Sequence, residues 1–451
     1  MKNQIIESIK EGILLSPDLT ELQLFPTQTL EEKRRVEIIQ SNLVEDNSKK
    51  SIKNFISLYN TRFLSLQSIL KQRQELNSMN SIRRVKEMDE KSKVSFIGMV
   101  LDKAITKNNN IIFTLEDQTG IIKCIVTKNN KEAFNIAKET SFDEVIGVSG
   151  SKGKGVVFIN SIIMPDVPLN KELKKAPLDE AAVFIGDLHA GAHAFLKKNF
   201  ENLLSWISGE TGSEEQKERA SKIKYLFILG DLVEGVGIFP GQEKDLEIKD
   251  IYEQFNLVSN YLKKIPEHIN VIICAGNHDP VRIAEPQPKI PRKFLEEIYD
   301  KPNMFFIQNP SLINIAKTET FPGFNILIYH GYSFPYYASN IEGIRMAGGL
   351  EAIESVMIYL LKRRHLAPAH GSTRYHMGYN KDPLVIRTVP DFFVTGHIHR
   401  ATIKNYRNIT LLNTSCWVSQ TDYQEKRGLM PEPNKAIYVN LKTRNTKLLN
   451  F

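Results

Sequence analysis

Residues 271–279 read Val-Ile-Ile-Cys-Ala-Gly-Asn-His-Asp, an apolar run that ends in amide, imidazole and carboxylate side chains. Four other apolar runs end in the same way, within the segments 181–189, 225–231, 324–331 and 392–399. A continuous apolar run is typical of a strand buried on both faces, and ligands gather beyond the carboxyl ends of such strands. We therefore predict an α/β domain whose polar side chains meet at the ends of its strands.

The side chains at these strand ends offer oxygen and nitrogen donors and no thiolate. The candidate metal ligands are Asp187, His189, Asp231, Asn277, His330, His397 and His399. Carboxylate, amide and imidazole groups together favour manganese, iron or zinc over calcium or an all-oxygen magnesium site. One ion needs fewer than seven ligands, so we expect two divalent ions about 3.5–4 Å apart, with Asp231 as the natural bridge. One histidine after a strand is a weak signal, but five such strand ends in one chain are a strong one.

Composition places the chain among ordinary folded proteins. Its 451 residues carry 59 basic and 52 acidic side chains, and the net charge of +7 leans towards a nucleic-acid partner. No stretch approaches the roughly 18–20 apolar residues of a membrane span, and charge interrupts the first residues too early for a secretory signal. The three cysteines lack metal-binding or disulfide spacing. We therefore expect a cytoplasmic protein without a membrane partner.

Changes in texture divide the chain into four parts. Residues 1–72 carry apolar side chains at helical spacing, as in Ile5, Ile9 and Ile13, and predict a separate N-terminal helical unit. Residues 73–92 are polar and predict a linker. Residues 93–168 show short strands, a hairpin and a short helix, which predict an OB-fold β-barrel. Residues 177–451 contain the five strand ends and form the predicted catalytic domain.

The predicted barrel allows two functions. An OB fold often binds single-stranded nucleic acid through basic and aromatic side chains. This segment has several lysines but few aromatic residues beyond Phe96, Phe113 and Phe158, which suit a core as well as a stacking surface. We favour an architectural or subunit-docking barrel, and contact with DNA remains the alternative.

The strand-end motifs, taken together, resemble a known signature. Asp187-x-His189, Gly230-Asp231, 276–279, His330-Gly331 and 396–399 are similar, in order, to the motifs of calcineurin-like metallophosphoesterases. Four further blocks, at 235–242, 284–288, 362–368 and 417–421, resemble the small subunits of archaeal family D DNA polymerases. The resemblance covers about residues 93–451 and implies an αββα sandwich behind the barrel. It also implies a manganese-dependent 3′–5′ exonuclease that proofreads DNA ends for a separate large catalytic subunit.

The resemblance assigns roles to individual residues. One ion would be held by Asp187, His189, Asp231 and His399, and the other by Asp231, Asn277, His330 and His397. His278 would stay free to stabilise charge or to protonate the leaving oxygen, as histidine can do near pH 7. Independently of the resemblance, the basic pair Arg363 and Arg364 is expected to contact DNA phosphates. Manganese is the expected metal, with Fe²⁺ and Zn²⁺ as alternatives.

Three ambiguities accompany this interpretation. The spacing of His365 and His370 would allow metal binding on a loop, but the ligand set is complete without them, so we favour a structural role or contact with the DNA backbone. The aromatic residues Phe334, Tyr336 and Tyr337 could stack on a frayed base or pack inside the domain. At the level of the whole protein, the alternatives are a catalytically silent scaffold subunit and a double-strand-break repair nuclease. Retention of all seven ligands argues against the scaffold, and about 180 residues before the motifs argue against the repair nuclease.

Overall fold

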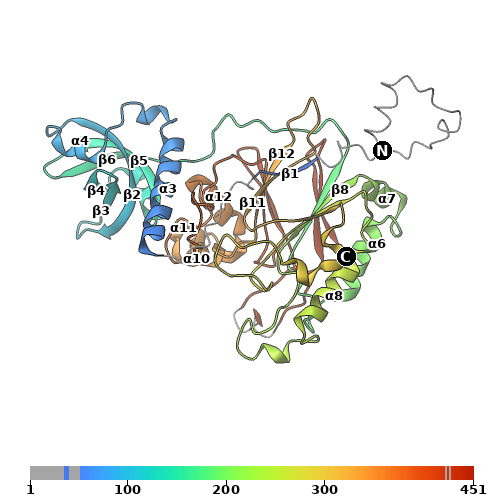
Figure 1. The fold of residues 1–451 in the computed structure, drawn as a ribbon. Helices are drawn as coiled ribbons and strands as arrows, with labels where there is room; N and C mark the ends of the chain where they lie inside the picture. The colour runs from blue at the N-terminus through green and yellow to red at the C-terminus, as the bar shows by residue number, and fades with distance from the viewer. Residues whose placement is uncertain (1–34, 40–50, 422–423, 426–427) are drawn as a thin grey trace, which may run out of the picture.

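The computed structural model describes residues 35–39, 51–421, 424–425 and 428–451. The helix predicted around Ile5–Ile13 lies outside these residues. The described chain forms a five-stranded closed barrel beside a larger body built on two six-stranded sheets (Figure 1). Within the described residues, no helix combines the length and apolarity needed to cross a bilayer.

The first sheet has the strand order β10-β9-β8-β7-β16-β17. Its strands are β7 (Ala181–Ile185), β8 (Ile223–Leu229), β9 (Asn270–Cys274), β10 (Met304–Phe306), β16 (Lys435–Asn440) and β17 (Thr446–Asn450). Strands β7 to β10 run parallel. Along β7, Ala182 and Phe184 enter one core while Val183 and Ile185 enter another, because successive side chains point to opposite faces. Burial on both faces explains the continuous apolar run.

The second sheet has the strand order β1-β11-β12-β13-β15-β14. Its strands are β1 (Val36–Ile38), β11 (Ser311–Ile315), β12 (Phe324–Tyr329), β13 (Phe392–Thr395), β14 (Thr402–Tyr406) and β15 (Ile409–Asn413). Strands β12, β13 and β15 run parallel. The two sheets share one apolar core, which includes Phe184, Phe227, Phe324 and Phe392.

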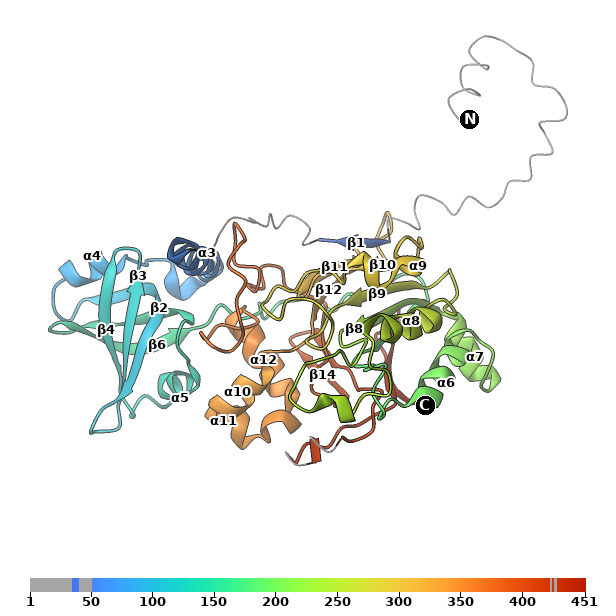
Figure 2. The same cartoon turned by 60° about the horizontal axis from the view of Figure 1, so that its bottom comes forward.

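Helices cover the outer face of each sheet. The first sheet carries α6 (Lys197–Ile207), α7 (Glu214–Ser221), α8 (Ile251–Leu262) and α9 (Glu296–Tyr299), and the second carries α10 (Phe334–Asn340), α11 (Glu342–Met346) and α12 (Ile353–Arg363). Figure 2 shows these two helical groups on opposite sides of the paired sheets. The predicted αββα sandwich is therefore confirmed. The carboxyl ends of β7, β8, β9, β12 and β13 carry the predicted ligands.

The predicted barrel is also confirmed. Its closed order is β2-β3-β4-β6-β5. The elements are β2 (Lys93–Ile105), β3 (Ile111–Asp117), β4 (Gly120–Val126), α5 (Lys131–Glu139), β5 (Val145–Lys152) and β6 (Val156–Ile163). Phe96 and Phe113 are fully buried in the barrel core, so neither can stack on a base, whereas Phe158 is 44% exposed.

The segment predicted as a linker differs from that expectation. Residues 73–92 contain the 3₁₀ helix η2 (Gln74–Leu76) and the helix α4 (Ile82–Glu87). Leu76, Ile82 and Val85 are at most 1% exposed and pack against the barrel. Only a few apolar residues, spread among polar ones, anchor this segment. The polar composition of the segment therefore predicts a linker, but the structure shows that its few apolar residues are part of the barrel's core.

The predicted N-terminal unit differs as well. Helix α3 (Ile52–Leu70) agrees with the helical spacing, but Val36–Ile38 forms strand β1, paired antiparallel with β11. Helix α3 is not separate, because Phe63, Leu66 and Leu70 share a core with barrel residues and with Val385 of the sandwich. The buried Arg62 adds an ion pair to Asp382, with Nε and Oδ2 2.7 Å apart. Helix α3 thus fastens the barrel to the sandwich.

Candidate metal centre

The structure brings all seven predicted ligands together. They follow five strands: Asp187 and His189 after β7, Asp231 after β8, Asn277 after β9, His330 after β12, and His397 and His399 after β13. Five of these residues have positive φ angles, between 48° and 71°. This left-handed conformation is costly for residues other than glycine and concentrates at functional sites. The fold therefore holds these side chains in strained but converging positions.

The first donor group consists of Asp187, His189 and His399. Nε2 of His189 and Nε2 of His399 are 3.2 Å apart, and Nε2 of His399 lies 3.4 Å from Oδ1 of Asp187. Donors bound about 2.0–2.2 Å from a common ion are themselves about 3 Å apart. The spacing of this group therefore fits a divalent ion.

The second donor group consists of Asp231, His330 and His397, with Asn277 beside it. Nε2 of His330 lies 3.2 Å from Oδ2 of Asp231 and 3.1 Å from Oδ1 of Asn277. The same Oδ2 atom of Asp231 is 3.8 Å from Nε2 of His189, in the first group. Asp231 thus stands between the two groups, where a bridging carboxylate would be needed.

Charges inside this cluster shift the pKa values of its members. Burial alone would raise the pKa of Asp231, but His330, His278 and His189 hold that pKa well below its usual value. Burial would lower the pKa of His330, but Asp231 and Asp187 raise it to about 9. Burial and the neighbouring His330 lower the pKa of His397 to about 3. A metal must displace the proton of His330 to bind there, so binding would release protons.

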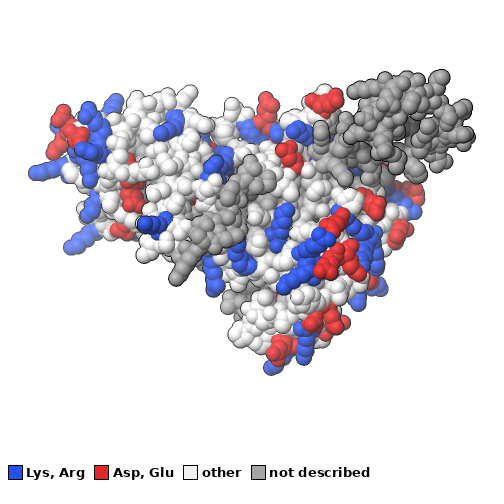
Figure 3. Space-filling view, in the orientation of Figure 1, with Lys and Arg blue, Asp and Glu red and all other residues white. Residues whose placement is uncertain are grey.

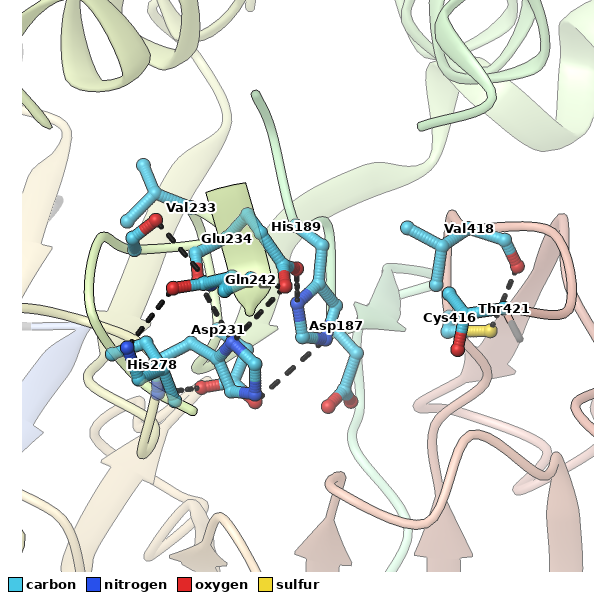
Figure 4. Close-up of polar contacts among 12 residues, drawn as sticks. Asp187, His189, Asp231, Val233, Glu234, Gln242, His278, Cys416, Val418 and Thr421 are labelled. Atoms are coloured by element: carbon cyan, nitrogen blue, oxygen red, sulfur yellow. Dashed lines mark hydrogen bonds and ion pairs between the residues drawn. The ribbon is translucent and has the colours of Figure 1, made fainter. Parts of the chain in front are cut away.

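His278 belongs to neither of these two donor groups and clusters instead with His189 and Glu234. Its backbone N–H donates to Oδ1 of Asp231 at 2.8 Å. Its Nδ1 lies 2.8 Å from the backbone oxygen of Glu234 and must donate, because a carbonyl oxygen can only accept (Figure 4). The ring nitrogen Nε2 is therefore the atom at which His278 can gain or lose a proton.

Glu234 is a member of the centre that the sequence patterns did not single out. Its Oε2 atom lies 2.8 Å from Nδ1 of His189, and its side chain is 10% exposed. The available signal was a carboxylate three residues after Asp231, but one acidic residue beyond a strand end carries little information in a chain with 52 of them.

The expectation that Arg363 and Arg364 bind DNA is wrong. Their exposures are 6% and 3%. Nε of Arg363 bonds Oε1 of Glu144 at 3.1 Å, and its guanidinium lies over the Tyr359 ring. Arg364 donates to the backbone oxygens of residues 386 and 387, both at 2.7 Å. Both guanidinium groups are committed inside the protein and join α12 to its surroundings.

The other uncertain side chains are mostly structural. His365 is fully buried and its Nε2 bonds Oδ2 of Asp382 at 3.0 Å. Exposed His370 lies 3.3 Å from the Tyr59 hydroxyl. Phe334 and Tyr337 are fully buried, which excludes base stacking, whereas Tyr336 is half-buried. Half-buried Tyr332, which the sequence patterns also missed, places its ring 5.8 Å from that of His397.

Comparison with known proteins agrees with this geometry. Residues 182–401 match the family of calcineurin-like phosphoesterases. The fold and the donor groups thus define a metallophosphoesterase domain.

Relatives that match nearly the whole chain identify a more specific family within the metallophosphoesterases. A DNA polymerase II small subunit of Methanothermobacter thermautotrophicus is 36% identical over 414 residues, which cover 91% of this chain and 82% of that protein. The DNA polymerase II small subunit of Archaeoglobus fulgidus is 35% identical, over 90% of this chain and 81% of that protein. That of Pyrococcus abyssi is 34% identical, with coverages of 97% and 70%. The chain belongs to the family of archaeal DNA polymerase II small subunits.

Proposed function

We propose that this protein is the small subunit of a family D replicative DNA polymerase and removes nucleotides from DNA 3′ ends with two divalent ions. The observation that carries the proposal is the complete set of seven donors, arranged in two groups around Asp231. We expect Mn²⁺, because imidazole ligands suit it better than they suit Mg²⁺. Fe²⁺ and Zn²⁺ are the other ions that this donor set accepts.

The residues supply binding and proton transfer. Two bound ions would provide Lewis acidity to the phosphate and to an attacking water. Asp231 fixes the two donor groups relative to each other, because its Oδ2 atom faces both His189 and His330. When the bond between phosphorus and the 3′-oxygen breaks, that oxygen needs a proton. His278 can provide it from Nε2, because its Nδ1–H is already held by a carbonyl oxygen.

Preference for a mismatched end follows from the depth of the site. Asp187, Asp231 and His330 are at most 1% exposed, so a terminal nucleotide must leave its base pair for its phosphate to reach them. Unpairing costs a few kcal/mol in a matched duplex and less at a mismatch. A site that acts only on an unpaired DNA end does not need a continuous basic stripe on the protein surface. On the face shown in Figure 3, positive and negative side chains are interspersed over the sandwich.

Docking of a large catalytic subunit is the second part of the proposal. A groove of about 590 Å³ lies between α3, the barrel and the loop after α12. It is lined by apolar side chains such as Phe55, Ile56 and Phe63 and by the carboxylates of Glu116, Asp117 and Asp143. Among the residues that the structure describes, the lining contains three carboxylates and no lysine or arginine, a composition that repels DNA phosphates. We therefore assign this face of the barrel to a basic, apolar segment of the large subunit.

The alternatives are less well supported. A silent scaffold has no need for seven retained donors or for five strained ligand backbones. A repair nuclease is disfavoured by the barrel and helix α3, which precede the phosphoesterase domain and are fastened to it.

A time course on 5′-labelled DNA tests the proposal. Purified protein is incubated with Mn²⁺, Mg²⁺, Fe²⁺ or Zn²⁺ and a duplex that ends in a matched or mismatched 3′ nucleotide. We expect shortening from the 3′ end, faster with Mn²⁺ than with Mg²⁺, faster at the mismatch, and slower as salt rises. Degradation only from the 5′ end, or activity without metal, would refute the proposal.

A further inference from the structure

We infer that Glu234 is a positioning residue that uses two different groups for two histidines. Its carboxylate orients the metal ligand His189, and its backbone oxygen orients the proton donor His278 (Figure 4). The inference rests on the proposed function, because it assigns those roles to the two histidines. It predicts that changing the side chain at position 234 weakens metal binding and leaves the orientation of His278 unchanged.

The carboxylate fixes which nitrogen of His189 faces the metal position. Oε2 of Glu234 accepts a hydrogen bond from Nδ1 of His189 at 2.8 Å. With the proton held on Nδ1, the lone pair of Nε2 points towards His399, 3.2 Å away, and towards Oδ2 of Asp231, 3.8 Å away. A histidine that ligates a metal commonly donates its other N–H to a carboxylate, and loss of that partner costs about 10–100-fold in metal affinity.

Gln242 fixes the second carboxylate oxygen. Oε1 of Gln242 accepts from the backbone N–H of Ile238 at 2.9 Å, so the amide nitrogen must point the other way. That nitrogen donates to Oε1 of Glu234 at 3.2 Å and to the backbone oxygen of Glu234 at 3.0 Å. Both carboxylate oxygens of Glu234 therefore accept hydrogen bonds.

Because both oxygens of Glu234 accept hydrogen bonds, a glutamine cannot replace this carboxylate. A glutamine at position 234 has the same shape but only one acceptor end, so its NH₂ group would face either His189 Nδ1–H or the Gln242 amide, both of which are donors. One hydrogen bond is lost and two donors are brought together in a buried site. His189 loses its fixed orientation.

The backbone around Glu234 does not depend on its side chain. The N–H of Glu234 donates to the oxygen of Ala190 at 3.0 Å, which ties the loop after β8 to the loop after β7. The next residue, Gly235, has a φ of 77°, and a Cβ there would lie 2.4 Å from the backbone oxygen of His278. This glycine lets the loop after β8 approach the loop after β9, which carries His278. The carbonyl of residue 234 therefore remains against Nδ1 of His278 in a side-chain variant.

Calorimetric titration of metal-free, full-length protein with Mn²⁺ tests the inference. Glu234→Gln should weaken the affinity by about 10–100-fold at one of the two ions. Glu180→Gln is the matched control. Glu180 is also a buried carboxylate, but it lies directly before β7, at the opposite end of that strand from the metal ligands, and it pairs with Arg35. The control should bind Mn²⁺ as the wild type does. Equal affinities in Glu234→Gln and the wild type would overturn the inference.

Nuclease rates at increasing Mn²⁺ give the second readout. Saturating Mn²⁺ should restore Glu234→Gln to within about threefold of the wild type, because His278 is still held by the backbone, whereas it should not restore His278→Ala. A Glu234→Gln rate that stays as low as that of His278→Ala at saturating Mn²⁺ would refute the division of roles. The Mn²⁺ titration remains decisive if the wild type cuts no DNA, so failure of the proposed function is distinguishable from failure of this inference.

Discussion

Replacing Asp231 by asparagine is the most informative single change to the metal centre. Oδ2 of Asp231 faces Nε2 of His330 at 3.2 Å and Nε2 of His189 at 3.8 Å, so this one carboxylate serves both donor groups. Loss of a partner that only supports a ligand costs 10–100-fold in metal affinity. Loss of a shared ligand should cost at least about 100-fold for each ion, which is about 2.8 kcal/mol.

The same substitution should change the stability of the metal-free protein only slightly. An asparagine oxygen can still accept the backbone N–H of His278, which now bonds Oδ1 of Asp231 at 2.8 Å. Without the carboxylate, His330 loses its main reason to carry a proton and can be buried neutral. We expect the free energy of unfolding to change by less than about 2 kcal/mol.

Asp391→Asn is the matched control for this prediction. Asp391 is 1% exposed and pairs with Lys171 at 2.7 Å and Lys174 at 2.8 Å, outside the metal centre. Breaking these pairs should cost about 1.5–3 kcal/mol of stability, because both lysine side chains remain partly exposed, and should leave the Mn²⁺ affinity unchanged. Calorimetric Mn²⁺ titration and urea unfolding measure both quantities. An Asp231→Asn protein that binds two ions within threefold of the wild-type affinity would refute the bridging role.

The remaining predictions concern three other parts of the molecule. His278→Ala should keep both ions, by elemental analysis, and lose about 100–1,000-fold in nuclease rate, and release of either ion by this variant would contradict its assignment. Burial, with Arg62 nearby, lowers the pKa of His365 to about 4, against 6.5 when unfolded. Below pH 6.5 the unfolded state binds the extra proton, so stability should fall by about 3 kcal/mol between pH 6.5 and 4. In urea unfolding this loss should be absent from His365→Gln, and an equal loss in that variant would contradict the assignment. Glu116→Lys in the groove should weaken binding of the purified large subunit at least tenfold, whereas Glu132→Lys on α5, outside the groove, should not. If both variants bound the large subunit with equal affinity, the groove would not be the docking site.

The fold and most of the centre could be predicted because their signals are local. A strand buried on both faces must be apolar throughout, and a ligand at its carboxyl end must follow directly in sequence, as in Ile185 to Asp187. The barrel strands likewise carry their own turn signals, such as 116–120 between β3 and β4.

The failures involve partners that are distant in sequence. The buried partner of Arg363 is Glu144, 219 positions earlier, and nothing local distinguishes this arginine from a surface phosphate contact. Strand β1 was not predicted for the same reason, because it pairs with β11, nearly 280 residues later in the chain. Glu234 was missed for a related reason, since its importance arises only where His189, Gln242 and His278 meet.

Activity measured against the number of bound ions tests the central claim most directly. Metal-free protein is given Mn²⁺ in steps from zero to three equivalents, and both bound metal and shortening of a 5′-labelled strand from its 3′ end are recorded at each step. The account predicts tight binding of two ions per chain and exonuclease activity that reaches its full value only when the second site is filled. Full activity in metal-free protein, or unchanged activity in the Asp231→Asn variant, would contradict it.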